Sequence, residues 1–297
     1  MANLMHFVNQ ILGRPSAGGP VPNCYILTGI PRAGTTLTCK LLSEQEQVAG
    51  LNEPIPFRNL QSRQDALDRI HKSLANFRKS LIENATAPVR GHNGQITDNH
   101  FERSEKGDRK KVIQRSVVHF DQSFQADFKL FVKHNAVFTL LLKDLQGDYP
   151  CFAMVRNPLA LLGSWSTVSV PVSRGKMRYL SLLDPEGQSA LEQKQGLLNR
   201  QLFLLDYYFK AYDALPAEQV IRYEDLMASN GDRLANMIKQ PYHQQTVLSG
   251  KNKGAVYPRD AMLRFGDALL LDEANHCWKF YSKSEAETLY AFYEHQK

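Results

Sequence analysis

The chain has 297 residues, of which 43% are hydrophobic and 22% charged, a composition typical of globular proteins. The four cysteines lie far apart, with no CxxC pair and no Cys/His metal spacing, which argues against a zinc module, a redox pair and a disulfide framework. No apolar run reaches the roughly 20 residues that a membrane span needs. Residues 1–20 lack a basic stretch before a long apolar run, so we expect no signal peptide, no membrane partner and a cytoplasmic location.

The net charge of +6 suits a protein with an anionic ligand. The densest basic stretch, residues 103–115, contains acidic residues and lacks aromatic residues at stacking spacing. A solvated or substrate-facing loop therefore fits this stretch better than a nucleic-acid surface, and we expect no nucleic-acid partner.

Short apolar runs alternate with helical patterns along the chain. Strands are predicted at 24–28, 48–54, 130–134, 151–156 and 220–223, and helices at 34–45, 64–81, 191–215 and 225–238. This alternation predicts an α/β protein, a three-layer P-loop-type domain with a central parallel sheet flanked by helices. We expect one domain over 1–297 with a core at about 22–265 and irregular lid segments at 84–112, 168–190 and 249–268.

A glycine-rich turn follows the first predicted strand in the segment YILTGIPRAGTT, residues 25–36. A strand that runs through such a turn into a helix directs backbone N–H groups at one point and forms an anion site. Gly29 and Gly34 have the separation of a Walker A loop, but Thr35 stands where the lysine would be and the basic residue is Arg32. No predicted strand ends in an acidic residue that could hold Mg²⁺. The loop therefore predicts phosphate binding without a metal and argues against a nucleotide-dependent kinase.

The hexapeptide PRAGTT closely resembles the Pro-[Lys/Arg]-Ser-Gly-Thr-Thr loop of the sulfotransferases that use 3′-phosphoadenosine 5′-phosphosulfate (PAPS) and release 3′-phosphoadenosine 5′-phosphate (PAP). Ala33 in place of the usual serine is the departure from that pattern. The resemblance implies that Arg32, Thr35 and Thr36, with the backbone amides of residues 33–36 (Ala33 and Gly34 included), contact the 5′-phosphate and the sulfonate of PAPS. It implies no metal.

Three later segments extend the resemblance, by order and motif, over residues 25–265. In 151–166, Arg156 and Ser164 are eight residues apart, the spacing of the family's 3′-phosphate site. VIRYEDL at 220–226 resembles the family's strand with a tyrosine near the adenine, which implies that role for Tyr223. Lys253 and Gly254 are candidates for a lid over the 3′-phosphate, although the family's Arg-Lys-Gly arrangement is not matched. Glu224 and Asp225 are interpreted as capping and first-turn charges of a helix.

Two residues are candidates for the general base. Glu53 lies 21 residues after Arg32, an interval similar to that of the tyrosylprotein sulfotransferases, whose base is a glutamate; its alternative role is to cap the turn before Pro54. His134 could take a proton with a near-neutral pKa or could be structural. Lys133 matches a lysine of the family and would stabilise the charge that develops on the sulfonate. His92, His100 and His119 are each interpreted as surface histidines.

These residues predict a sulfotransferase that moves a sulfuryl group from PAPS to a hydroxyl or amine of a small-molecule acceptor, for example a natural product. A carbohydrate or lipid head group as acceptor remains open, as does a non-catalytic PAP- or nucleotide-binding protein of the same fold. The sequence does not choose between O- and N-sulfation and says nothing about the oligomeric state.

Overall fold

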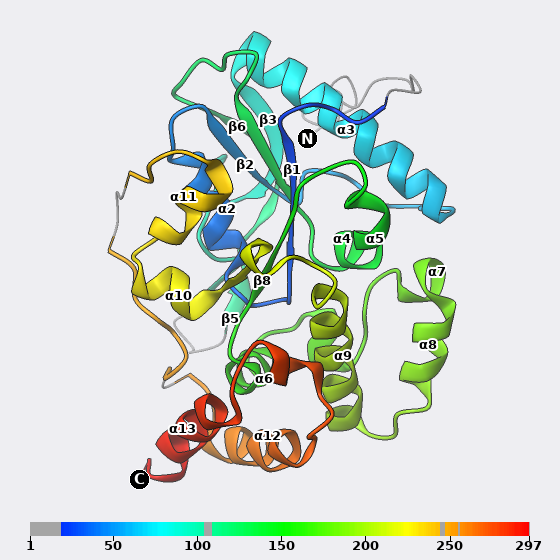
Figure 1. Cartoon of the computed structure of the whole chain (residues 1–297), viewed down its shortest axis with the longest axis vertical. Helices are drawn as coiled ribbons and strands as arrows, with labels where there is room; N and C mark the ends of the chain where they lie inside the picture. The colour runs from blue at the N-terminus through cyan, green and yellow to red at the C-terminus, as the bar shows by residue number, and fades with distance from the viewer. Residues whose placement is uncertain (1–18, 104–108, 244–246, 255, 297) are drawn as a thin grey trace.

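A computed structural model describes residues 19–103, 109–243, 247–254 and 256–296. The prediction that residues 1–20 contain no signal peptide concerns a segment of which residues 1–18 lie outside the described residues. The central sheet has five parallel strands in the order β2-β7-β1-β8-β9. They are β1 (Cys24–Gly29), β2 (Val48–Asn52), β7 (Lys129–Lys133), β8 (Cys151–Val155) and β9 (Val220–Arg222). This sheet, flanked by helices, confirms the predicted α/β class and each predicted strand (Figure 1).

Helices and smaller elements surround this sheet. The helices are α2 (Thr35–Ser43), α3 (Arg63–Asn84), α4 (Ala136–Leu140), α5 (Leu142–Leu145), α6 (Pro158–Ser166), α7 (Leu180–Leu183), α8 (Pro185–Glu192), α9 (Leu197–Tyr212), α10 (Tyr223–Ala228), α11 (Ala235–Ile238), α12 (Arg259–Leu271) and α13 (Lys283–Glu294). The 3₁₀ turns are η1 (Pro171–Arg174), η2 (Ala217–Gln219), η3 (Asp232–Leu234) and η4 (His276–Lys279), and the remaining strands are β3 (Thr86–Gly91), β4 (Phe101–Arg103), β5 (Arg109–Lys111) and β6 (Gln114–His119). In the described part of the chain, no helix has the length and apolar character to cross a membrane.

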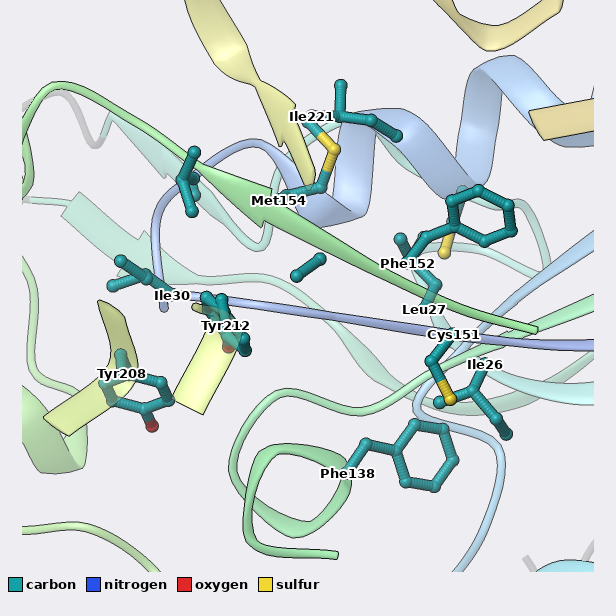
Figure 2. Packing of buried hydrophobic residues seen from close by; sticks show 14 of the residues in the cluster. Ile26, Leu27, Ile30, Phe138, Cys151, Phe152, Met154, Tyr208, Tyr212 and Ile221 are labelled. Carbon is teal, nitrogen blue, oxygen red and sulfur yellow. The ribbon is translucent and has the colours of Figure 1, made fainter. Parts of the chain in front are cut away.

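The central strands are buried on both faces, which explains why they are continuous apolar runs rather than alternating ones. Ile26 pairs with Cys151 and Leu27 with Phe152, and Figure 2 shows these two pairs on opposite faces of the sheet. Gly29 lets β1 approach β8 closely, since a Cβ there would lie 2.7 Å from the carbonyl oxygen of Met154. The end of β1 is therefore fixed against β8 at the point where the glycine-rich turn begins.

Two predicted helices have different bounds in the structure. The helix predicted at 191–215 corresponds to α9, which begins only at Leu197. Residues up to Glu192 belong to α8, and Gly196 (φ 77) has a non-helical conformation that separates the two helices. The helix predicted at 225–238 is divided into α10, η3 and α11, because Asn230 (φ 53) and Gly231 (φ 98) adopt the left-handed conformation that breaks a helix.

The three segments expected to be irregular contain regular elements. Segment 84–112 holds β3, β4 and β5, and β3 pairs antiparallel with β6. Segment 168–190 holds η1, α7 and the start of α8, and 249–268 holds the start of α12. The expected core limit at about 265 is also wrong, because α12 and α13 pack on α6 and the side chains of Tyr281, Leu289 and Tyr293 are buried (Figure 1).

Candidate active site

The carboxyl ends of the five parallel strands meet at one edge of the sheet, the edge at which α/β proteins bind ligands. Along this edge Glu53 follows β2, Lys133 ends β7, the glycine-rich turn follows β1, Arg156 follows β8 and Tyr223 follows β9. A cavity of about 730 Å³ opens over the edge. The predicted site residues that line it are Arg32, Gly34, Thr35, Thr36, Glu53, Lys133, His134, Arg156, Tyr223 and Gly254.

The glycine-rich turn leads directly into α2. Gly34 is the N-cap at φ 90, and a Cβ there would lie 2.9 Å from the ring of Tyr223, so a glycine is required for both reasons. Ala33 is buried and its N–H donates to the carbonyl of Ile30 at 2.9 Å, which closes the turn. The sequence predicts that the backbone amides of residues 33–36 bind the phosphate. Those of Gly34, Thr35 and Thr36 lie at the N-terminus of α2, where the helix dipole favours an anion.

Arg32 lies beside this helix N-terminus and is half-buried. Its Nε donates to Ser164 Oγ at 3.2 Å and its Nη1 to Asn99 Oδ1 at 3.1 Å, and the guanidinium lies over the ring of Phe101. Burial, together with the charges of Arg109 and Arg156, lowers the pKa of Arg32 to about 10. Such a convergence of cations favours an anion between them.

Arg156 is 4% exposed and forms the second cationic position. Its Nε donates to Asn252 Oδ1 at 2.8 Å, its Nη1 to the carbonyl of Arg32 at 3.1 Å and its Nη2 to Tyr257 Oη at 3.1 Å. The guanidinium also lies 4.6 Å from the ring centroid of Tyr223. The end of β8 is thereby connected to the glycine-rich turn and to the segments that carry Asn252 and Tyr257.

Not every residue that the sequence predicts to bind PAPS lines the cavity. Ser164 is fully buried in α6 and pairs with Arg32 rather than with Arg156. Lys253 points to α13, where its Nζ lies 5.1 Å from the ring centroid of Phe292, and it does not line the cavity. Lys251 lines the cavity instead.

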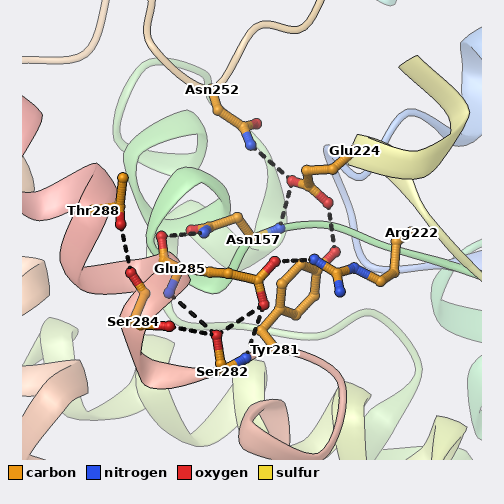
Figure 3. Close-up of polar contacts among 9 residues, drawn as sticks. All are labelled: Asn157, Arg222, Glu224, Asn252, Tyr281, Ser282, Ser284, Glu285 and Thr288. Carbon is orange, nitrogen blue, oxygen red and sulfur yellow. Dashed lines mark hydrogen bonds and ion pairs between the residues drawn. The ribbon is translucent and has the colours of Figure 1, made fainter. Parts of the chain in front are cut away.

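Glu224 joins the end of β8 beside Arg156 to the C-terminal part of the chain (Figure 3). It accepts hydrogen bonds from the N–H of Asn157 at 2.9 Å, from Asn252 Nδ2 at 2.7 Å and from Tyr281 Oη at 2.7 Å. Tyr293 completes the connection, since its hydroxyl is 3.1 Å from the carbonyl of Asn252 and hydrogen-bonds to it. Glu224 does lie in the first turn of α10, as predicted, but its contacts across the fold gave no signal in the sequence.

Glu53 and Lys133 form an ion pair at the other end of the edge. The Lys133 side chain is 1% exposed, and its Nζ donates to Glu53 Oε1 at 3.1 Å and to Asn52 Oδ1 at 3.3 Å. Arg90 Nη1 lies 3.6 Å from Glu53 Oε2. Burial alone would raise the pKa of Glu53, but Lys133 and the neighbouring cations outweigh it and lower the pKa below its ordinary value. Glu53 is therefore ionised at neutral pH.

His134 has a buried ring whose Nε2 accepts the N–H of Ile55 at 3.2 Å. The rings of Phe57 and Phe138 pack against it edge to face. Burial lowers the pKa of His134 to about 3, in contrast to the near-neutral pKa expected from the sequence. These contacts favour the structural alternative for His134.

His100 is not the surface residue that the sequence predicts. It lines the cavity, and its Nε2 lies 3.0 Å from Thr36 Oγ1 and 2.9 Å from Asn52 Nδ2, so it joins α2 to the end of β2. Burial lowers its pKa to about 3. His92 and His119, in contrast, do not line this cavity. Among the described residues no group of His, Cys, Asp and Glu side chains comes together as a metal site.

No protein-family model matches the chain, and no curated protein matches its sequence. A solved structure that it resembles is the sulfotransferase domain from the olefin synthase of Synechococcus PCC 7002, at 13% sequence identity and a TM-score of 0.37, over 96% of this chain and 98% of that one. At this level of similarity, the residues at the sheet edge carry the functional conclusion.

Proposed function

We propose that this protein is a sulfotransferase that transfers a sulfuryl group from PAPS to a hydroxyl or amine of a small-molecule acceptor. The observation that carries the proposal is the order of groups along the sheet edge. Two anion-binding positions, one at the N-terminus of α2 with Arg32 and one at Arg156, share the cavity with an ion pair of Glu53 and Lys133. Nucleotide binding alone does not need this ion pair.

The residues present fit the charges of PAPS. The amides of Gly34, Thr35 and Thr36 suit the 5′-phosphate, Arg156 suits the 3′-phosphate, and Tyr223 beside them suits the adenine. PAPS supplies the sulfuryl group, and its phosphate oxygen is the leaving group. Arg32 and Lys133 would stabilise the charge on that oxygen and on the sulfonate.

Glu53 is the better supported general base. It is ionised, lines the cavity and is 23% exposed, whereas the acceptor nitrogen of His134 is occupied by a backbone N–H. The acceptor oxygen or nitrogen attacks sulfur as the bond from sulfur to the phosphate oxygen breaks, and the acceptor's proton passes to Glu53. Lys133 holds the carboxylate in place while this happens.

A thermal-shift titration with PAP, with and without Mg²⁺, tests the proposal. We expect micromolar or tighter binding that does not need the metal; a ligand at 100 times its Kd stabilises a protein by about 2.7 kcal/mol. ATP with Mg²⁺ is the control, because the missing Walker lysine predicts that it binds more weakly. If PAP gives no rise in Tm under either condition, the proposal is wrong. If PAP binds but labelled PAPS transfers nothing to any acceptor, the non-catalytic alternative is correct.

The location and the acceptor belong to the same proposal. The four cysteines are free, buried thiols, which suits a reducing compartment, and we propose a cytoplasmic enzyme. A carbohydrate or lipid head group is the alternative acceptor.

A further inference from the structure

A second group of cations lines the same cavity beyond Glu53. We name the side chains of Arg58, Arg90, Lys111, Arg115 and Arg178 the distal cluster; all of them line the cavity. Arg90 and Arg115 are directly opposite each other on the antiparallel strands β3 and β6. Like charges in that position repel each other and destabilise the pair of strands.

The distal cluster is too far along the sheet edge from Arg156 to bind the 3′-phosphate of the sulfuryl donor. β3 contacts β2, the outer strand of the central sheet, so the cluster lies at the β2 end. Arg156 follows β8, three strands away from β2, and strands are about 4.8 Å apart, which puts the two ends about 14 Å from each other. Glu53, the proposed base, lies at the β2 end, which is where an acceptor has to bind.

Among the described residues, few negative charges balance these cations. Of the described residues that line the cavity, twelve are lysine or arginine and the acidic ones are Glu53 and Asp98. Glu53 is already shared between Lys133 and Arg90, and Arg115 donates to a neutral partner, the carbonyl of Pro54, at 3.3 Å. Burial and the charges of Arg90 and Arg58 lower the pKa of Arg115, which agrees with this crowding of positive charge.

From this arrangement we propose that the acceptor is itself an anion, whose carboxylate or phosphate binds the distal cluster while its hydroxyl or amine reaches Glu53. The inference rests on the proposed function. Ile55, Phe57 and Met177 also line the cavity, so a short apolar body between the anionic and the reacting group fits the site. The acceptor's charge would relieve the repulsion between Arg90 and Arg115.

Binding of three matched phenols tests the inference by calorimetry, with and without saturating PAP. The probes are 4-hydroxybenzoate, 4-hydroxyphenyl phosphate and their neutral counterpart 4-hydroxybenzamide. We expect one or both anions to bind at least about 10-fold more tightly than the amide, as expected for a charge-assisted hydrogen bond, and the stronger of the two identifies the anionic group. Arg90→Gln and Arg115→Gln should each remove most of this preference. Arg233→Gln is the control, because Arg233 is exposed and does not line the cavity.

A further measurement separates the outcomes. PAP affinity should stay within a few-fold in both arginine variants, because neither Arg90 nor Arg115 belongs to the proposed donor positions. Equal binding of all three probes, or no binding of any of them to a protein that binds PAP, overturns the inference and leaves the proposed function intact. A parallel loss of PAP affinity in the variants also overturns it, because the cluster would then belong to the donor. A failure to bind PAP contradicts the proposed function, and the measurements without PAP still decide whether the cavity prefers anions.

Discussion

Replacing Glu53 by glutamine separates the proposed role of Glu53 as general base from its role as the partner of Lys133. At 3.1 Å, two unit charges in an effective dielectric of about 20 attract by about 5 kcal/mol. Desolvation offsets part of this attraction, and the Glu53 side chain is 23% exposed, so we expect Glu53→Gln to destabilise the fold by about 3 kcal/mol, the lower end of the range for a broken buried pair. The destabilisation arises because the Lys133 ammonium, at 1% exposure, is left without its counter-charge.

Urea unfolding of four proteins measures this coupling: the parent, Glu53→Gln, Lys133→Met and the double variant. Lys133→Met should cost less, about 1–2 kcal/mol, because Glu53 can still be hydrated through its exposed edge. The double variant should regain most of the loss caused by Glu53→Gln, since no unpaired charge stays buried. Losses that simply add would show that the two side chains are not energetically coupled.

Transfer activity gives the second readout. Glu53→Gln should lower turnover by about 10²–10⁴-fold, the usual contribution of a general base, with PAP affinity within a few-fold of the parent. The double variant should stay inactive although its stability returns. Normal turnover in Glu53→Gln together with an inactive His134→Ala variant would refute the assignment of the base and transfer it to His134. If both variants are active, the acceptor needs no base.

Substitutions at Arg156, Glu224 and His134 give further testable predictions on ligand affinity and on stability. Arg156→Ala should weaken the binding of PAP by about 2–5 kcal/mol. It should weaken the binding of adenosine 5′-phosphosulfate, which lacks the 3′-phosphate, far less. If calorimetry shows equal weakening for both ligands, Arg156 is a structural residue. Glu224→Gln should weaken PAP about 10-fold, the equivalent of one charged hydrogen bond, while Asp225→Asn, which removes a charge from the same helical turn, should not. His134 is neutral in the fold with its pKa lowered to about 3, so its contribution to stability is complete above the unfolded pKa and is lost as the pH falls below it. For an unfolded pKa of about 6.5, we therefore expect His134 to account for about 2 kcal/mol of the stability lost between pH 7 and pH 5. His100, whose pKa is also lowered to about 3, adds a loss of its own, so His134→Asn should reduce the total loss by about 2 kcal/mol and the control His119→Gln should leave it unchanged.

The parts of the site that depend on local sequence could be predicted. Short apolar runs identified the five parallel strands, and the turn into α2 placed Arg32 and Gly34 at the sheet edge. Since parallel strands direct their carboxyl ends to one edge, Glu53 and Arg156 could be assigned to a common site before their contacts were known.

The parts that depend on long-range packing could not be predicted. Ser164 was expected with Arg156, eight residues away, but it pairs with Arg32, which is 132 residues away in sequence. His100 is 64 residues from Thr36, and no periodicity or motif connects the two. Strand β3 lies in segment 84–112, which the sequence predicts to be irregular, and the opposition of Arg90 and Arg115 follows only from the register of β3 with β6.

The hydroxyl of Tyr293 connects the last helix to the loop that holds Asn252, and through it to Arg156. We therefore expect PAP affinity to depend on the C-terminal helix as well as on the residues that line the cavity. A shortened version that ends before α13 would lose this support and the packing of α13 on α6 together. For protein engineering, this makes the C-terminal helix a poor place to cut or to graft, even though it contributes no residue to the cavity lining.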